Sequence, residues 1–536
     1  MKRIVALLLL LAMLLCGCSA SAWQDMMNQL GSMLGIPGVT DFSDMVYTRP
    51  DMTLFRQNLQ DCLSAVETET KAASLMDKIY PFYETYYDFY TAYSLSNIYY
   101  CKDLTDIYWT EEYAYCSENC AEVDAGMDQL LYALADCPLR EDLESEEYFG
   151  PDFFHYYDGE SIWDETFTAL ANQEAALINE YYELSTQALE QEYYSEAFFQ
   201  SCGAQMAQLF VELMALRQEI AAYAGYDSYV QFSYDFYYLR DYTPEQAQGF
   251  LDGIQKELVP VYRDLPDDVW QPMYTGCSES QTLSYVQQCA AAMGGTVADA
   301  FQLMQSAHLY DIAYSENKYD ASFEVFLTSY YEPFIFVNPT LSDSDKLTFA
   351  HEFGHFCNDY ASGGTYADVD VAEIFSQSME FLSLFYCKDT EDLKRMKFAD
   401  SLSVFVEQSA YASFEQQVYS LKGEDLTVEN VQALYEQIGT AYGFAEQNRD
   451  SRDYVLINHF FTNPMYIISY VVSNDAALQI YQLEQAQSGA GAKLLQDNLA
   501  TQEAYFLAFL ESAELKSPFT DSRPAEIRAL MEAALG

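Results

Sequence analysis

Two histidines and a glutamate form a short motif in the middle of the chain. Residues 348–357 read TFAHEFGHFC, so His351 and His355 are four residues apart and Glu352 follows the first histidine. On a helix, residues four apart project from the same face, and their imidazoles can bind one metal ion. Glu352 projects about 100° away from His351, where a general base can reach a metal-bound water. Because the chain has only 5 histidines in 536 residues, this spacing predicts a metal site that does chemistry.

A catalytic zinc site needs a third protein ligand from another segment, and several acids follow the motif. Glu373 lies eighteen residues after His355 in YADVDVAEIFSQSMEFLSLF, a segment with helical periodicity. Glu380 lies one heptad later on the same face and is an alternative, as a ligand or as a hydrogen-bond partner of a histidine ligand. Asp368 and Asp370 lie nearer the loop and are further candidates for orienting the ligands. Spacing alone leaves these alternatives open.

The motif helix is expected to follow a short sheet. Residues 321–331 (ASFEVFLTSYY) and 333–338 (PFIFVN) are rich in β-branched and aromatic residues and predict two strands. Ser342, three residues before Asp345, is a suitable N-cap for the helix, and the glycine pair that begins at Gly363 marks its end.

Helices are expected over most of the remaining chain. Apolar residues recur at three- and four-residue spacings over 203–225 and 244–263, and 80–101 is predicted to be an aromatic-rich helix. Half of the residues are hydrophobic, which is enough for a large core. The predicted fold class is therefore mainly α, with a small β-sheet next to the motif helix.

These segments resemble the oligoendopeptidase F and thimet oligopeptidase family of zinc metallopeptidases, which are HExxH gluzincins. LTFAHEFGHF followed by DVAEIFSQSMEFL is similar to the family's HEFGH and its later E-x-x-S-x-x-M-E segment. The resemblance implies that His351, His355 and Glu373 bind one zinc ion per chain and that Glu352 is the general base on zinc-bound water. It also implies a two-lobed helical zincin-like fold with a deep substrate channel, and hence short unstructured oligopeptides as substrates.

A later segment extends the resemblance. Residues 456–484 (LINHFFTNPMYIISYVVSNDAALQIYQLE) are similar to a family segment in which a histidine precedes a tyrosine-bearing helix. The Asn-Pro pair at 463–464 predicts a helix start there, which would place Tyr466 and Tyr470 on one face. By resemblance, His459 binds substrate, and one or both tyrosines donate hydrogen bonds to the oxyanion of the transition state. Which tyrosine does so remains open.

The N-terminus predicts export and lipid anchoring. MKRIVALLLLLAMLLCGCSAS has two basic residues, then an apolar run too short to favour a membrane-spanning helix, and its end resembles the lipobox of bacterial lipoproteins. Cleavage before Cys18 would make this cysteine the lipidated first residue. The predicted organisation is a signal peptide over 1–17, a tether over 18–49, an N-terminal helical lobe over 50–200 and a catalytic domain over 201–536. The expected location is outside the cytoplasmic membrane, anchored by lipid.

The charge of the chain disfavours nucleic acid as a partner, and its cysteines leave the disulfide pairing open. With 83 acidic and 25 basic residues, the net charge is −58, so nucleic acid is not an expected partner, and membrane contact is expected only through the lipid anchor. Ten of the 12 cysteines lie beyond Cys18, and their pairing cannot be read from the sequence.

The combined interpretation is a zinc-dependent endopeptidase. One alternative is a non-catalytic peptide-binding lipoprotein on the same fold, but binding alone would not need Glu352. A structural zinc site is a second alternative. Such sites, however, usually have four protein ligands with no open position, and they favour cysteine. Cys357 is two residues past His355 and would point away from the metal.

Overall fold

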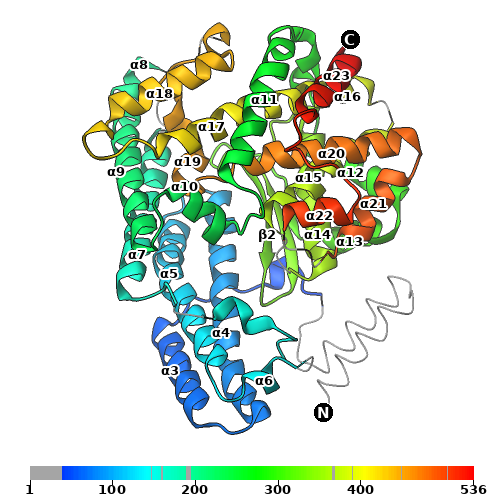
Figure 1. Ribbon diagram of the computed structural model, residues 1–536. Helices are drawn as coiled ribbons and strands as arrows, with labels where there is room; N and C mark the ends of the chain where they lie inside the picture. Colours follow the sequence, from blue (N-terminus) through cyan, green and yellow to red (C-terminus); the bar gives the residue numbers. More distant parts are fainter. Residues whose placement is uncertain are drawn as a thin grey trace.

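The structure is a computed structural model that describes residues 39–145, 148–158, 161–188, 195–364, 368–388, 390–447, 449–501, 503 and 505–536. The predicted signal peptide, Cys18 and most of the predicted tether lie outside the described residues. Helices dominate the described chain and surround one small sheet, which confirms the predicted fold class (Figure 1). No described helix is both long enough and apolar enough to cross a bilayer.

The elements before the sheet are all helical, and η denotes 3₁₀ or π turns. They are η1 Phe42–Asp44, α3 Met52–Thr68, α4 Ala72–Lys102, α5 Ile107–Ala135, α6 Arg140–Leu143, η2 Phe153–Tyr157, α7 Glu165–Ala188, α8 Glu196–Phe199, α9 Cys202–Tyr223, α10 Tyr229–Phe232, η3 Ser233–Tyr237, α11 Pro244–Arg263, η4 Asp267–Tyr274, α12 Glu279–Met293 and α13 Gly295–Ser306. The three helices predicted over 80–101, 203–225 and 244–263 correspond to α4, α9 and α11.

The sheet and the elements after it complete the described chain. They are β1 Tyr310–Asp311, β2 Ser322–Leu327, β3 Glu332–Val337, α14 Asp345–Ser362, α15 Val369–Tyr386, α16 Glu391–Ser403, η5 Val404–Gln408, α17 Ser409–Val418, η6 Gly423–Asp425, α18 Val428–Ala441, η7 Phe444–Gln447, η8 Asp453–Leu456, α19 Asn458–Thr462, α20 Ile468–Ala486, α21 Ala490–Asn498, α22 Phe506–Ser512 and α23 Arg523–Leu535.

Buried apolar side chains form two clusters, and α4 belongs to both. Its first half, up to Phe89, packs with α3 and α5 in the smaller cluster, whereas Leu95 and later residues belong to the larger one. Accordingly α3 to α6 project from the rest of the molecule (Figure 1). α7 lies within residues 50–200, the range of the predicted N-terminal lobe. Its buried side chains, including Phe167 and Leu184, nevertheless belong to the larger cluster.

The three strands have the order β1-β3-β2. β3 is fully buried in the centre, parallel to β1 and antiparallel to β2, with Ser322 opposite Val337 and Leu327 opposite Glu332. β2 is an edge strand, so one of its sides lacks a partner strand within the sheet. The two predicted strands thus correspond to β2 and β3.

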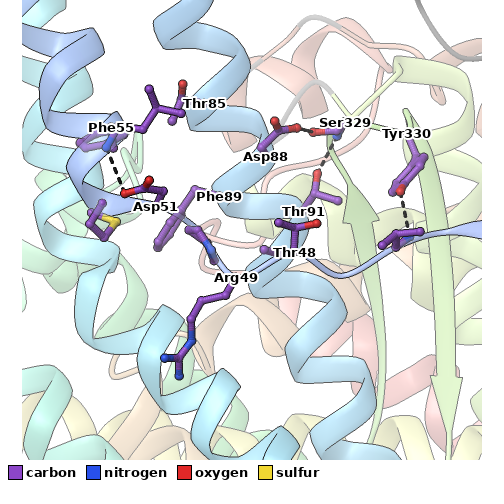
Figure 2. Close-up of a pocket in the computed structure, with 15 residues that line it drawn as sticks. Thr48, Arg49, Asp51, Phe55, Thr85, Asp88, Phe89, Thr91, Ser329 and Tyr330 are labelled. Carbon is purple, nitrogen blue, oxygen red and sulfur yellow. Dashed lines mark hydrogen bonds between the residues drawn. The ribbon is translucent and has the colours of Figure 1, made fainter.

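Contacts with α4 hold the turn between β2 and β3. The Ser329 backbone N–H donates to Thr91 Oγ1 at 2.7 Å, and the Ser329 hydroxyl donates to Asp88 at 2.8 Å. Tyr330 accepts a hydrogen bond from the Val46 N–H at 3.0 Å. These contacts border a cavity of about 420 Å³ that none of the predicted site residues lines (Figure 2). The hairpin is therefore anchored to the helix that links the two apolar clusters.

α14 lies between the sheet and α15, and α15 lies between α14 and α20. Most residues of α15 are buried, and the buried set includes polar side chains such as Glu373, Ser376 and Glu380. α14 ends at Ser362, and its C-cap Gly363 has a left-handed φ of 70°, so the glycine pair marks the helix end as predicted. The helix begins at Asp345, later than a cap at Ser342 would place it. The cap differs: the Ser342 side chain does not cap α14, because the Asp345 carboxylate instead accepts the backbone N–H groups of Thr340 at 3.0 Å and Ser342 at 3.1 Å.

The helix predicted to start at the Asn-Pro pair starts later. α20 begins at Ile468, and Tyr466 precedes it in a turn where Met465 has a φ of 68°. Two contacts hold this turn off the helical path. Glu415 accepts the Met465 N–H at 2.9 Å, and Tyr238 donates to the Pro464 carbonyl at 2.9 Å.

Candidate metal centre

Three predicted ligands converge between α14 and α15. His351 and His355 project from one face of α14, with ring centroids 5.0 Å apart. Glu373 Oε2, from α15, lies 3.4 Å from His351 Nε2 and 3.7 Å from His355 Nε2. Within the described chain this is the group of donors that could hold a metal, with all three ligand atoms within 4.8 Å of one another. Two imidazoles and one carboxylate match the donor set of a catalytic zinc site with an open position.

Gly354 allows α14 and α15 to approach closely enough for this convergence. A Cβ at this position would lie 2.5 Å from the Ser376 Cα and 2.7 Å from the Phe375 carbonyl oxygen. Both atoms belong to the α15 backbone, which cannot move aside without shifting the helix. The glycine of the HEFGH motif therefore has a packing role that its two histidines depend on.

Glu380 holds a histidine and does not join the converging donors. Its carboxylate lies 2.9 Å from His351 Nδ1 and 2.7 Å from the Lys397 ammonium of α16. Because a carboxylate can only accept, His351 Nδ1 carries a hydrogen, and Nε2 is the nitrogen that faces Glu373. Of the two glutamates that the sequence left open, Glu373 faces both histidines and could join them as a ligand, whereas Glu380 lies behind His351.

The Glu373 carboxylate is held at both oxygens. Tyr466 donates to Oε1 at 2.8 Å, and the Ser376 hydroxyl donates to Oε2 at 2.9 Å. Of the two aspartates considered as orienting groups, Asp368 caps the start of α15, and Asp370 pairs with the buried Arg240 at 3.2 Å. Both aspartates therefore orient α15 itself.

Glu352 lines a pocket next to the donors. The pocket has a volume of about 310 Å³, and His351, Gln377 and Tyr470 also line it. Burial, assisted by the charges of nearby glutamates and opposed by His351, raises the pKa of Glu352 to about 7. A carboxyl group with this pKa can take up and release a proton near neutral pH.

The two histidines of the motif differ in their protonation. Burial disfavours the charged ring of His351, but the hydrogen bond to Glu380 and the charges of neighbouring glutamates outweigh it and raise its pKa to about 9. Burial, together with the charge of His351, holds the pKa of His355 well below its ordinary range. A metal ion that binds here would therefore displace a proton from His351.

His459, Tyr466 and Tyr470 form a cluster beside the donors. The Tyr466 and Tyr470 ring centroids are 5.3 Å apart, and His459 Nε2 lies 3.2 Å from the Tyr470 hydroxyl. The two tyrosines face different partners, because Tyr466 donates to Glu373 whereas Tyr470 contacts His459. Burial, reinforced by the charge of Glu373, raises the pKa of both phenols well above the ordinary value, so both remain protonated donors.

Sequence analysis missed two residues that act on the ligands. Lys397 lies on a separate helix and is 2% exposed; no spacing pattern connects it with Glu380. Ser376 belongs to the recognised segment, and its position three residues after Glu373 was a signal that its hydroxyl could reach that carboxylate.

Comparison with known proteins gives one family match and several structures of similar fold. Residues 42–160 match the family model of the Peptidase M3 N-terminal domain. No curated protein matches the chain at a significant level. A solved structure assigned as an oligoendopeptidase F has a TM-score of 0.80 at 21% identity, covering 92% of this chain and 98% of that chain.

Two further solved structures are similar over the same span. PZ peptidase A with an inhibitor has a TM-score of 0.80 at 18% identity, covering 92% of this chain and 99% of that chain. A protein from Bacillus anthracis str. Ames assigned as an oligoendopeptidase F has a TM-score of 0.76 at 19% identity, covering 92% and 98%. The chain therefore has the fold of the oligoendopeptidase F structures.

Proposed function

We propose that this protein is a zinc-dependent endopeptidase that hydrolyses short unstructured oligopeptides. The observation that carries the proposal is the convergence of His351, His355 and Glu373 beside a pocket lined by Glu352. These residues would hold one zinc ion. The match to the Peptidase M3 N-terminal domain and the shared fold support a peptidase, and the donor set supports zinc.

Zinc bound at these donors would supply Lewis acidity, which polarises a carbonyl and activates water. Residues of the chain itself would transfer the proton and orient the ligands. Glu352 accepts the proton of the attacking water and delivers it to the leaving amine. Glu380 and Lys397 keep His351 oriented, and Tyr466 and Ser376 keep Glu373 oriented.

Tyr470 is the proposed donor to the oxyanion of the transition state. Its hydroxyl contacts His459 Nε2 and lines the same pocket as Glu352, whereas Tyr466 is committed to Glu373. His459 is the proposed substrate-binding residue. β2 is an edge strand of the described sheet that contacts α4 and α14, and its unpaired backbone groups can add an extended peptide as a further strand.

The proposed location is outside the cytoplasmic membrane, with a lipid on Cys18 as the only membrane contact. Its support is the apolar run and lipobox-like end of the N-terminus, which lie outside the described residues. Incorporation of a labelled fatty acid into the expressed chain, compared with a Cys18→Ala variant, tests it. Equal labelling of the two chains would exclude Cys18 as the anchor.

The first experiment tests catalysis directly. The zinc-loaded protein is incubated with a pool of short peptides beside Glu352→Gln with matched zinc content, and products are identified by mass spectrometry. We expect internal cleavage by the wild type and a loss of about 10²–10⁴-fold in rate for the variant, because the general base is removed. Intact peptides with zinc bound in both proteins would instead favour the non-catalytic peptide-binding lipoprotein.

A further inference from the structure

Two cysteines far apart in sequence meet between α12 and the end of α15. Cys289 lies on α12 and is 1% exposed, while Cys387 is the C-terminal cap residue of α15 and is half-buried. Each of the two thiols shifts the pKa of the other, and the Cys289 Sγ lies 3.6 Å from the Met293 Sδ. The Cys387 thiol also lies 3.2 Å from the Tyr285 carbonyl, one turn before Cys289 on the same helix. The contact therefore belongs to a packed interface between two helices.

The two thiols differ in a way that suits thiol–disulfide exchange. Cys387 is half-buried and lines a cavity of about 470 Å³ together with Thr390, Lys394 and Tyr481, whereas Cys289 is 1% exposed. Hydrogen bonding from Cys289 lowers the pKa of the Cys387 thiol despite burial, whereas the pKa of Cys289 is raised. A cavity-lining thiol with a lowered pKa beside a second, buried thiol is the arrangement of an attacking and a resolving cysteine.

Other cysteines of the described chain lack this combination. Burial raises the pKa of Cys357 well above its ordinary value, and the pKa of Cys277 is raised in the same way. Cys116 and Cys120 are close in sequence, but both lie on α5, and burial raises the pKa of each.

We propose that Cys289 and Cys387 form a reversible intramolecular disulfide that ties α12 to the C-terminal end of α15. The oxidant is a disulfide, either a small molecule or a protein. The Cys387 thiolate attacks one of its sulfurs, forms a mixed disulfide and releases the first thiol. The Cys289 sulfur then attacks Cys387, passes its proton to the second leaving thiolate and closes the bond. Two protein thiols are oxidised to one disulfide, and one disulfide is reduced to two thiols.

The link would act on the helix that carries Glu373 and Glu380. α12 contacts both α14 and α15, so the bond would fix the far end of α15 against the group of helices that forms the metal centre. The inference does not depend on the proposed peptidase activity, because it concerns thiol chemistry alone.

The experiment titrates the reduced full chain with oxidised glutathione, quenches with acid, alkylates under denaturing conditions and maps the thiols by mass spectrometry. In the wild type we expect a loss of about 2 mass units and a linked peptide pair containing residues 289 and 387. Alkylation of these two thiols should fall by at least about tenfold and return after addition of a reductant. The melting temperature should rise on oxidation, because the bond closes a long loop.

Three variants separate the outcomes. Cys387→Ser should form no link at Cys289, Cys289→Ser should retain glutathione on Cys387, and Cys277→Ser should behave as the wild type. The proposal is overturned if both thiols remain alkylatable in the wild type or if glutathione stays on Cys387 while Cys289 is free. Protection that a chelator reverses and a reductant does not would indicate a bound metal and would also overturn it.

Discussion

Tyr466 and Tyr470 carry the same hydroxyl group but contact different partners. Tyr466 donates to the Glu373 carboxylate at 2.8 Å, whereas the Tyr470 hydroxyl lies 3.2 Å from His459 Nε2. A hydroxyl committed to a ligand carboxylate stabilises the metal site, and one beside the pocket can donate to a developing negative charge. Replacement by phenylalanine should therefore lower kcat at Tyr470 and zinc affinity at Tyr466.

We expect Tyr470→Phe to lower kcat by about 10²–10³-fold with unchanged zinc affinity, because a transition-state donor is lost. Tyr466→Phe should weaken zinc binding by about 10–100-fold, because Glu373 loses a supporting hydrogen bond. Chelator competition measures the affinity, and peptide cleavage at saturating zinc measures kcat. The assignment is wrong if Tyr470→Phe loses zinc while Tyr466→Phe keeps it.

Lys397 acts on the metal site through two intervening residues. Its buried ammonium pairs with Glu380, which in turn accepts from His351. Lys397→Met leaves the Glu380 carboxylate buried without its cation, so we expect zinc affinity to fall by about 10–100-fold. Lys397→Arg should retain part of the affinity, because it keeps the charge.

Lys394→Met is the matched control, because Lys394 lies on α16 like Lys397. It lines the cavity beside Cys387, whereas Lys397 lines the pocket of Glu352. Zinc affinity by chelator competition separates these variants. If Lys397→Met and Lys394→Met bind zinc equally well, the His351–Glu380–Lys397 chain has no positioning role.

At the scale of elements, the spacing between α14 and α15 determines whether the donors meet. Gly354→Ala places a Cβ 2.5 Å from the α15 backbone, so the helices must separate. We expect a loss of at least about 1–3 kcal/mol in the free energy of unfolding, together with weaker zinc binding. Denaturant unfolding and chelator competition measure both effects.

Gly249→Ala is a suitable control, because Gly249 is an exposed helical residue of α11 with nothing within 4 Å of a new Cβ. Since alanine favours the helix by about 1 kcal/mol over glycine, this variant should be as stable as the wild type or more stable. Equal stability of the Gly354 and Gly249 variants would show that the close approach is not required.

At the scale of the whole molecule, the net charge of −58 should affect which peptides arrive at the site. We expect a higher kcat/KM for Lys-rich than for Glu-rich peptides of the same length, with a ratio that falls as salt rises. The screening length shortens from about 10 Å at 0.1 M salt to about 3 Å at 1 M, which weakens long-range attraction. Equal rates for matched peptides at both salt concentrations would exclude this effect.

The sequence by itself determined the motif, the predominance of helices and several individual elements. His351, Glu352 and His355 were recognisable because a helix repeats every 3.6 residues, so their relative placement is a local property. The helices α4, α9 and α11 followed from helical spacing of apolar and aromatic residues, and the two strands before the motif from their β-branched and aromatic composition. Resemblance to a family directed attention to Glu373 and to the tyrosine-bearing segment.

Only the tertiary structure decided which acid faces both histidines. It also decided which tyrosine hydroxyl donates to Glu373 and which one does not. Glu373 and Glu380 both contact α14, but Glu373 faces the Nε2 atoms of both histidines, whereas Glu380 contacts His351 Nδ1 and pairs with Lys397 of α16. The start of α20 moved to Ile468 because Glu415 and Tyr238, distant in sequence, hold the preceding turn. The contacts of Glu415 and Tyr238 with this turn join residues 50 and 226 positions apart, and local periodicity carries no information about them.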